Sequence, residues 1–328
     1  MHTMPSPSLP TEIILIIVND VSSLQDLRNL RTAGRAFCAA ATPRAFRTVG
    51  ATNRRDNALG LVSLLKSDLA NYVREVVYRE YAVDELPEDR DSRETVDADY
   101  GPAVEKPLVE AFTLAASLPW LRSLRFMFHP RCPAALQHAQ DRSAFLAFGS
   151  TSTALHLQRA LLATIGGAAP HLRALALTNV MPLPHAVYEL PTFQTALSSL
   201  TNLLISTASG MPRRGIGGAT WFMFWLFTIN RSILNSAVDV MSLSLMSSDH
   251  LIIVRSIADG AALPRLKYLT LRNVRMIGEA DLEEFVRRHG MLEWIDGFRG
   301  TEKVRWVRRT HADPLDKSEY EFPPSMAG

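Results

Sequence analysis

The chain has 328 residues, of which 47% are apolar and 21% are charged, and its formal net charge is +2. This composition is typical of a folded globular protein, and so small a net charge gives no reason to expect nucleic acid or an anionic membrane as a partner. The two cysteines, Cys38 and Cys132, are too few for a disulfide framework or a four-cysteine zinc site. We therefore expect a reducing compartment, either the cytoplasm or the nucleus.

The chain begins with a short polar lead, residues 1–8, which we predict to be disordered. Residues 9–49 are predicted to be helical, because proline at the entrance of a helix is favourable and Glu12 complements the helix dipole. The apolar run Ile13–Val18 lacks a basic flank and a cleavage site, so it is not predicted to be a signal peptide. Residues 50–70 are predicted to form a linker helix, chiefly over the run from Leu61 to Leu69.

Residues 71–300 contain an internal repeat. The segments that begin at Pro170 and Pro264 both read P-x-L-[R/K]-x-L-x-L-x-N-V, and the segment from Pro119 keeps the first eight positions with Phe as the last apolar residue. Weaker copies begin at Val73, Leu200, Val240 and Leu292. Apolar residues two positions apart share one face of a strand, and the proline stops a preceding helix. The asparagine is expected to satisfy backbone groups where the chain leaves the strand.

Helical stretches are predicted between these strands, at about 141–165, 188–199, 220–234, 249–261 and 279–289. One strand plus one helix per unit, with neighbouring units completing each other's core, predicts an α/β solenoid with parallel strands. The aromatic run Trp221–Phe227 is expected to be a helix buried between units. Residues 84–107, with nine acidic and three basic side chains, are predicted to be an acidic loop insertion, and residues 301–328 a basic segment and tail.

The N-terminal segment resembles a known module. It reads L-P-x-E-I from Leu9, then D-L-x-x-L from Asp26, R-x-F from Arg35 and P-x-x-F from Pro43. In order and spacing this phrase resembles the F-box, a three-helix module that binds the Skp-type adaptor of SCF (Skp–cullin–F-box) ubiquitin ligases. The repeat resembles the leucine-rich repeat, although its asparagine comes one position early and its unit lengths vary.

The F-box resemblance implies a set of residues that face the adaptor. These are Leu9, Pro10, Ile13, Ile17, Leu27 and Leu30. The plainer alternative is that such residues form the core of a small helical domain. That alternative suits Leu9 and Pro10 least, because a Leu-Pro pair at a helix entrance has little reason to lie deep in so small a core.

The side chains between the inward apolar positions of each strand are expected to line the open face of the sheet. Four of them, Arg125, Tyr268, Arg272 and Trp294, are predicted to contact a target protein. Arginine and aromatic side chains dominate the energetics of protein interfaces, which is the reason for choosing these four.

We find no sequence motif for catalysis, a cofactor or a metal. The chain has no G-x-S-x-G, Walker A or H-E-x-x-H phrase, and Gly215-Ile-Gly217-Gly218 lacks the full dinucleotide fingerprint. We therefore expect a non-enzymatic substrate receptor of an SCF-type ligase. Its expected partners are a Skp-type adaptor, the cullin core and an unknown protein target, with no nucleic acid, membrane or cofactor. A leucine-rich-repeat scaffold unconnected with ubiquitination stays open as the alternative, with an enzyme third.

Overall fold

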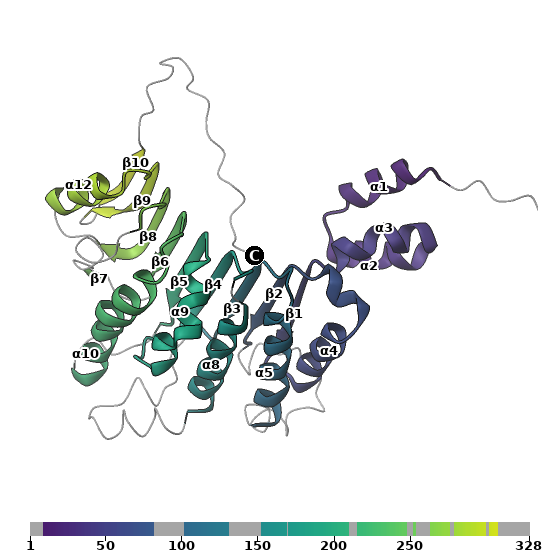
Figure 1. Ribbon diagram of the computed structural model, residues 1–328, viewed down its shortest axis with the longest axis horizontal. Coiled ribbons are helices and arrows are strands. Elements are labelled where there is room, and N and C mark those ends of the chain that lie inside the picture. Colours follow the sequence, from purple (N-terminus) through teal and green to yellow (C-terminus); the bar gives the residue numbers. More distant parts are fainter. Residues whose placement is uncertain are drawn as a thin grey trace, which may run out of the picture.

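The computed structural model describes residues 9–81, 102–130, 152–168, 170–209, 215–247, 252–253, 263–275, 279–299 and 302–307. Three helices come first: α1 (Thr11–Asp20), α2 (Leu24–Ala33) and α3 (Arg35–Ala45). They form a separate module beside one end of a long sheet (Figure 1). This order, a three-helix unit followed by alternating parallel strands and helices, confirms the predicted fold class.

The three-helix module has its own small core. The buried members are Ile14, Val18, Leu27, Ala41 and Ala45. Ser23 caps the start of α2: its hydroxyl oxygen accepts a hydrogen bond from the backbone N–H of Asp26 at 3.3 Å, as is usual for a serine cap. The guanidinium of Arg31 lies 4.5 Å from the centre of the Phe46 ring and ties α2 to the end of α3.

The sheet contains every strand of the described residues. They are β1 (Thr48–Thr52), β2 (Glu75–Arg79), β3 (Ser123–Met127), β4 (Ala174–Val180), β5 (Asn202–Thr207), β6 (Ser242–Met246), β7 (Ile252–Ile253), β8 (Tyr268–Arg275), β9 (Trp294–Arg299) and β10 (Glu302–Val307). Their spatial order is β1-β2-β3-β4-β5-β6-β8-β9-β10, with β7 beside β8. All neighbours run parallel except the last pair, β9 and β10. Seven of these strands, β2 to β6, β8 and β9, are the seven repeat phrases of the sequence.

The helices between the strands pack on one face of the sheet (Figure 1). They are α4 (Arg55–Leu65), α5 (Pro102–Ala116), α8 (Thr153–Thr164), α9 (Pro191–Ser198), α10 (Gly215–Met223) and α12 (Glu279–Arg288). Short 3₁₀ turns lie at η1 (Asp68–Tyr72), η4 (Ile165–Ala168) and η5 (Ala186–Glu189), and η6 (Phe224–Leu234) is a π-helix that continues α10.

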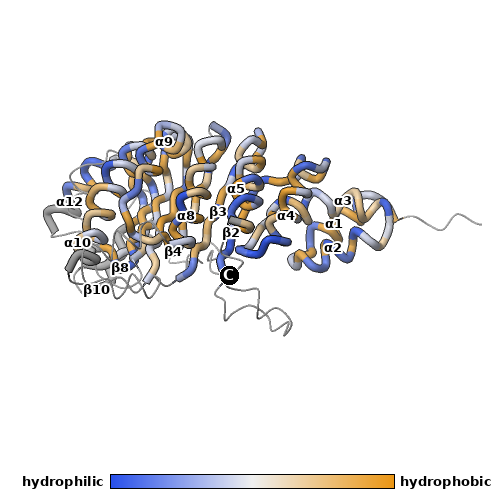
Figure 2. The backbone as a smooth tube through the Cα atoms, turned by 90° about the horizontal axis from the view of Figure 1, so that it is seen from below, coloured by the Kyte–Doolittle hydropathy of each residue, from blue (hydrophilic) through white to orange (hydrophobic). Residues whose placement is uncertain are grey.

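One continuous apolar core lies between this helical layer and the sheet. Alternate strand residues point into it, for example Val76, Phe126 and Leu177, which are all at most 1% exposed. Apolar residues accordingly recur in the strands and helices along the length of the sheet (Figure 2). The helices contribute large side chains such as Phe112, whose ring centre lies 4.9 Å from that of Phe126.

A backbone ladder fixes the register where each strand begins. The carbonyl of Arg74 accepts hydrogen bonds from two consecutive N–H groups of the next unit, those of Arg122 at 2.8 Å and Ser123 at 3.1 Å. The same pattern recurs from unit to unit, and its accepting carbonyls belong to Arg47, Arg74, Arg122, Arg173, Thr201, Met241 and Lys267. Ser242, Tyr268 and Trp294 consequently occupy one register position, 26 residues apart.

The asparagine of the repeat phrase marks the other end of the strand. Asn179 and Asn273 have positive φ angles of 58° and 53°, a conformation that asparagine tolerates better than most residues. Their side-chain amides donate to carbonyls of the preceding unit, Asn179 to Phe128 at 3.0 Å and Asn273 to Ser247 at 2.8 Å. The expected role of this asparagine is confirmed.

The segment 50–70 differs from the predicted linker helix. Residues Thr48–Thr52 form β1, which pairs parallel with β2, and α4 begins at Arg55 rather than near Leu61. The first strand-and-helix unit of the solenoid therefore begins directly after the three-helix module. Its strand was missed because Thr-Val-Gly-Ala-Thr lacks the leucines of the repeat phrase.

Three further predictions differ from the structure in part. Residues 102–107, expected to be loop, are the first turns of α5, while 84–101 lie outside the described residues. Ile252–Ile253, expected to be helical, form β7, and most of 249–261 lies outside the description. Residues 302–307 of the C-terminal segment form β10, while 308–328, like the lead 1–8, are not described.

Candidate functional site

Two surfaces carry the predicted site residues, and the first is the outer face of α1. Ile13, Ile16 and Ile17 recur at the spacing of one helical face, whereas Ile14 and Val18 point into the module's core. Leu9 is 50% exposed, Ile13 41% and Ile16 63%. Pro10 is also exposed, and Ile17 is half-buried. The structure thus places four of the six predicted adaptor-facing residues on or beside one apolar surface.

The two predicted residues of α2 lie differently. Leu27 is only 5% exposed and belongs to the module's core, and Leu30 is half-buried against that core. Leu27 therefore offers almost no surface to a partner. Ile16, which the prediction left out, is exposed on α1, and Leu24 at the start of α2 is exposed as well. The spacing of Ile16 relative to Ile13 was the signal in the sequence that would have found it.

Exposed apolar side chains are concentrated in this module. Among the described residues, thirteen large hydrophobic side chains are exposed, and five of them lie between residues 9 and 24. These five are Leu9, Ile13, Leu15, Ile16 and Leu24. Exposed apolar side chains are therefore more frequent in this segment than elsewhere in the described chain, although Leu15 lies on the side of α1 away from Ile13.

The second surface is the open face of the sheet, opposite the helices. Toward the β1 end of the sheet, Arg125 of β3 forms an ion pair with Glu75 of β2 at 3.1 Å. Both side chains are about three-quarters buried. Glu75 also accepts hydrogen bonds from the hydroxyls of Thr48 and Ser123, at 3.0 Å and 3.1 Å. Arg125 is therefore held in place by a network that spans β1, β2 and β3.

Tyr268 and Trp294 are direct neighbours across β8 and β9. Tyr268 is 46% exposed, and its hydroxyl donates to a carboxylate oxygen of Glu293 at 3.0 Å. That hydrogen bond to a carboxylate raises the pKa of Tyr268, and Glu293 likewise raises the pKa of Lys267, with which it pairs at 2.9 Å. The aromatic pair is thus flanked by a fixed pair of opposite charges.

The four predicted target residues do not form a single cluster. Arg272 is exposed on β8, four residues beyond Tyr268. Arg125 lies four strand steps from β8, which is about 19 Å at the usual strand spacing. Between them the open face carries mainly small or polar side chains, for example Ala176 and Ser244. Three predicted contacts therefore gather at β8 and β9, and the fourth stands apart.

Buried polar groups lie in the helical layer, between α8 and η5. Gln158 is 1% exposed, and its side-chain oxygen accepts a hydrogen bond from the N–H of Met181 at 2.9 Å. Burial raises the pKa of Tyr188 and lowers the pKa of His185 and of Arg159. In the described ranges no three histidine, cysteine, aspartate or glutamate side chains come together in a way that could hold a metal ion.

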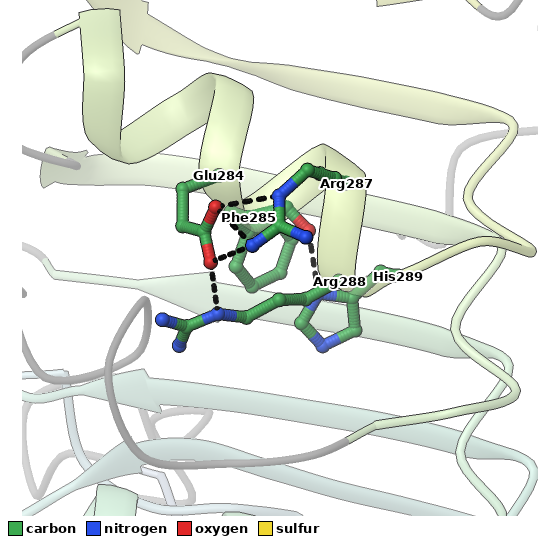
Figure 3. A network of polar contacts seen from close by, with 5 residues as sticks. All are labelled: Glu284, Phe285, Arg287, Arg288 and His289. Carbon is green, nitrogen blue, oxygen red and sulfur yellow. Dashed lines mark hydrogen bonds and ion pairs between the residues drawn. The ribbon is translucent and has the colours of Figure 1, made fainter.

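A second polar network lies on α12 (Figure 3). The carboxylate of Glu284 accepts hydrogen bonds from Arg287 at 2.7 Å and from Arg288 at 2.6 Å, which lowers the pKa of Glu284. His289 is buried, and its Nε2 accepts from the N–H of Leu263 at 3.4 Å while its Nδ1 lies 2.8 Å from the carbonyl oxygen of Phe285. Both features stabilise the last units of the solenoid.

Among the residues that the structure describes, no helix has both the length and the apolar character needed to cross a membrane. Comparison of the sequence with models of protein families and with curated proteins found no match.

Proposed function

We propose that this chain is a substrate-receptor subunit of an SCF-type ubiquitin ligase. In this proposal the α1–α3 module binds a Skp-type adaptor, and through it the cullin core, while the open face of the sheet binds a target protein. The chain itself makes and breaks no covalent bond. It acts by holding the target close to the ubiquitin-charged enzyme, which raises the effective concentration of the reacting groups.

The exposure of the apolar α1 face is the observation that carries the proposal. A surface helix that serves only its own domain typically has one apolar stripe toward the core and polar residues on the opposite face. Here Ile14 and Val18 fill the core, while Leu9, Ile13 and Ile16 remain on the surface. Covering such side chains contributes roughly 25 cal/mol per Å² of apolar area removed from water.

The proposal is tested by titrating the purified full chain with a purified Skp-type adaptor. Ile16→Asp places a charge at the most exposed apolar side chain of the proposed contact, and we expect it to weaken adaptor binding at least roughly tenfold. Leu15→Asp is the matched control, because Leu15 is also exposed but lies about 100° from Ile16 and about 160° from Ile13 around the helix. It should bind the adaptor like the wild type.

Two outcomes would speak against the proposal. Failure of the wild-type chain to bind any Skp-type adaptor would favour the alternative, a repeat scaffold without a link to ubiquitination. Equal losses in Ile16→Asp and Leu15→Asp, with unchanged helix content, would mean that the contact does not use the predicted face of α1. Pro10→Ala and Ile17→Asp extend the same series to the ends of that face.

A further inference from the structure

Four arginines lie side by side where strands β1 to β4 begin. Each directly precedes its strand, and they are Arg47, Arg74, Arg122 and Arg173. The backbone N–H of each later arginine donates to the carbonyl of the one before it, at 2.8 Å, 2.8 Å and 2.9 Å along the row. Neighbouring members are therefore about 4.8 Å apart, which is the spacing of adjacent strands. We call this row the arginine ladder.

The charge of the arginine ladder is not neutralised within the described chain. Over the described ranges none of the four guanidinium groups pairs with a carboxylate. Like charges at directly opposed positions of neighbouring strands destabilise a sheet. The equivalent position before β8 is different, because Lys267 pairs with Glu293 of the next unit at 2.9 Å. The ladder is thus a concentrated positive charge that this part of the molecule leaves unpaired.

Three of the guanidinium groups are held in place through one nitrogen, Nη1. Nη1 of Arg74 donates to the carbonyls of Asn71 and Val73, at 2.8 Å and 3.0 Å, and Nη1 of Arg122 donates to that of His171 at 3.1 Å. The carbonyls that Nη1 of Arg173 contacts belong to Pro170, Leu172 and Ser199. These contacts orient the planar groups but carry no opposite charge.

The other edge of each oriented group is available to a ligand. Among the described residues, Nε and Nη2 of Arg74, Arg122 and Arg173 have no hydrogen-bond partner. The N–H groups of Nε and Nη2 point to the same side of a guanidinium and match the two oxygens of a carboxylate. Arg122 and Arg173 are exposed, and Arg74 is half-buried. The ladder therefore offers a carboxylate-binding edge at three successive strand positions.

We propose that the arginine ladder binds an acidic segment of another protein, whose aspartate or glutamate carboxylates pair bidentately with successive guanidinium groups. Because Nη1 is already held, less side-chain freedom is lost on binding. The net charge of +2 gives no long-range field that would attract a polynucleotide, which favours a short acidic peptide segment. The inference goes beyond the proposed ligase function and uses none of the residues on which that function rests.

The proposal is tested by fluorescence anisotropy of a labelled oligoglutamate peptide titrated with the purified full chain. We expect the peptide to bind and its affinity to fall as salt is added, because salt screens exposed charges. Oligoglutamine of the same length, which keeps the shape but not the charge, should not bind. Failure of oligoglutamate to bind at low salt would overturn the proposal.

Arg122→Glu is the primary variant, because the Arg122 side chain has a single carbonyl contact in the described chain. It should weaken oligoglutamate binding roughly tenfold or more, since a charged bidentate contact is lost and a repulsion replaces it. Arg265→Glu is the matched control, because Arg265 is also exposed, precedes β8 and gives the same change in net charge. It should bind like the wild type, and equal losses in the two variants would contradict the assignment to the ladder.

Arg122→Lys combined with Arg173→Lys separates the bidentate contact from the charge. Lysine keeps the positive charge but lacks the planar edge, so binding should weaken roughly three- to tenfold. Urea denaturation checks that the variant is folded, and Arg122→Lys alone replaces it if the lost contacts of Arg173 unfold the chain. Wild-type affinity in a folded lysine variant would mean that charge alone suffices and would overturn the bidentate contact. Tighter binding of a single-stranded oligothymidylate than of oligoglutamate would assign the ladder to nucleic acid instead.

Discussion

Asn179 and Asn273 are two residues in which local conformation and packing between units depend on one side chain. Each adopts a positive φ angle as the chain leaves its strand, and each donates its amide to the carbonyl of the preceding unit. Alanine at either position would keep the strained positive φ angle and would lose the side-chain hydrogen bond. The repeated asparagine of the sequence therefore has a physical explanation at both positions.

We predict that Asn179→Ala lowers the free energy of unfolding by about 1–3 kcal/mol, from the lost hydrogen bond and the strained φ angle together. Asn179→Gly should cost less than Asn179→Ala, because glycine adopts the same φ angle without strain. Urea denaturation of the three proteins measures both differences. An alanine variant as stable as the wild type would contradict this account.

Glu284 gives a prediction for the dependence of stability on pH. Hydrogen bonds from Arg287 and Arg288 lower the pKa of this carboxyl from its ordinary value of 4.5, so the folded chain holds the ionised form more strongly than the unfolded chain does. The stabilisation is complete above pH 4.5 and is lost as the pH falls through the lowered pKa. The protection of the α12 amides, measured relative to the intrinsic exchange rate at each pH, should therefore fall in acid, and Glu284→Gln should remove this dependence. The same acid response in both proteins would contradict the prediction.

The strands were the elements that the sequence predicted best. Each repeat phrase places two leucines or equivalents two residues apart, and this spacing fits a strand with one buried face. Helix α5 was missed because Pro102 and Pro107 indicated a break, although Pro102 begins the helix, a position that proline favours. Strand β7 was missed because Ile252-Ile253 reads equally well as part of a buried helix.

The candidate adaptor surface was predicted in part, for a reason of geometry. The positions of Leu9, Pro10 and Ile13 follow from the entrance of α1, which is a local feature of the sequence. The burial of the Leu27 side chain depends on how α2 packs within the three-helix module. The periodicity of a single helix does not determine that packing.

Neighbouring residues of β3 should respond very differently to truncation. Phe126 is fully buried against Phe112, and Phe126→Ala should destabilise the chain by about 3–5 kcal/mol. Arg125 lies on the open face in a partly exposed ion pair, and Arg125→Ala should cost about 1 kcal/mol or less. Thermal and urea denaturation compare the two, and similar losses would mean that the open face is as tightly packed as the core.

At the scale of the whole molecule, the two candidate surfaces lie at opposite ends of the sheet. The module adjoins β1, whereas Tyr268 and Trp294 lie on β8 and β9 (Figure 1). Substitutions at sites so far apart, without shared neighbours, act additively. One surface can therefore be disabled without altering the other.

We predict that Tyr268→Ala combined with Trp294→Ala lowers capture of target proteins in proximity labelling, since aromatic side chains dominate interface energetics. Adaptor binding by the same variant should stay at the wild-type value. Ser242→Ala, at the equivalent position of β6, is the control and should capture targets normally. Parallel loss of adaptor binding in the double variant would show that the surfaces are not independent.

The two consecutive N–H groups that bind one carbonyl at the start of each unit determine how this protein tolerates changes in the length of its connecting segments. Each new strand takes its position from the unit before it, whatever length of chain intervenes between them. The spans from β2 to β3 and from β3 to β4 are nearly twice that from β8 to β9, yet all three pairs meet at the same register position. Connecting segments can therefore lengthen or shorten while the side chains of the open face keep their positions relative to one another.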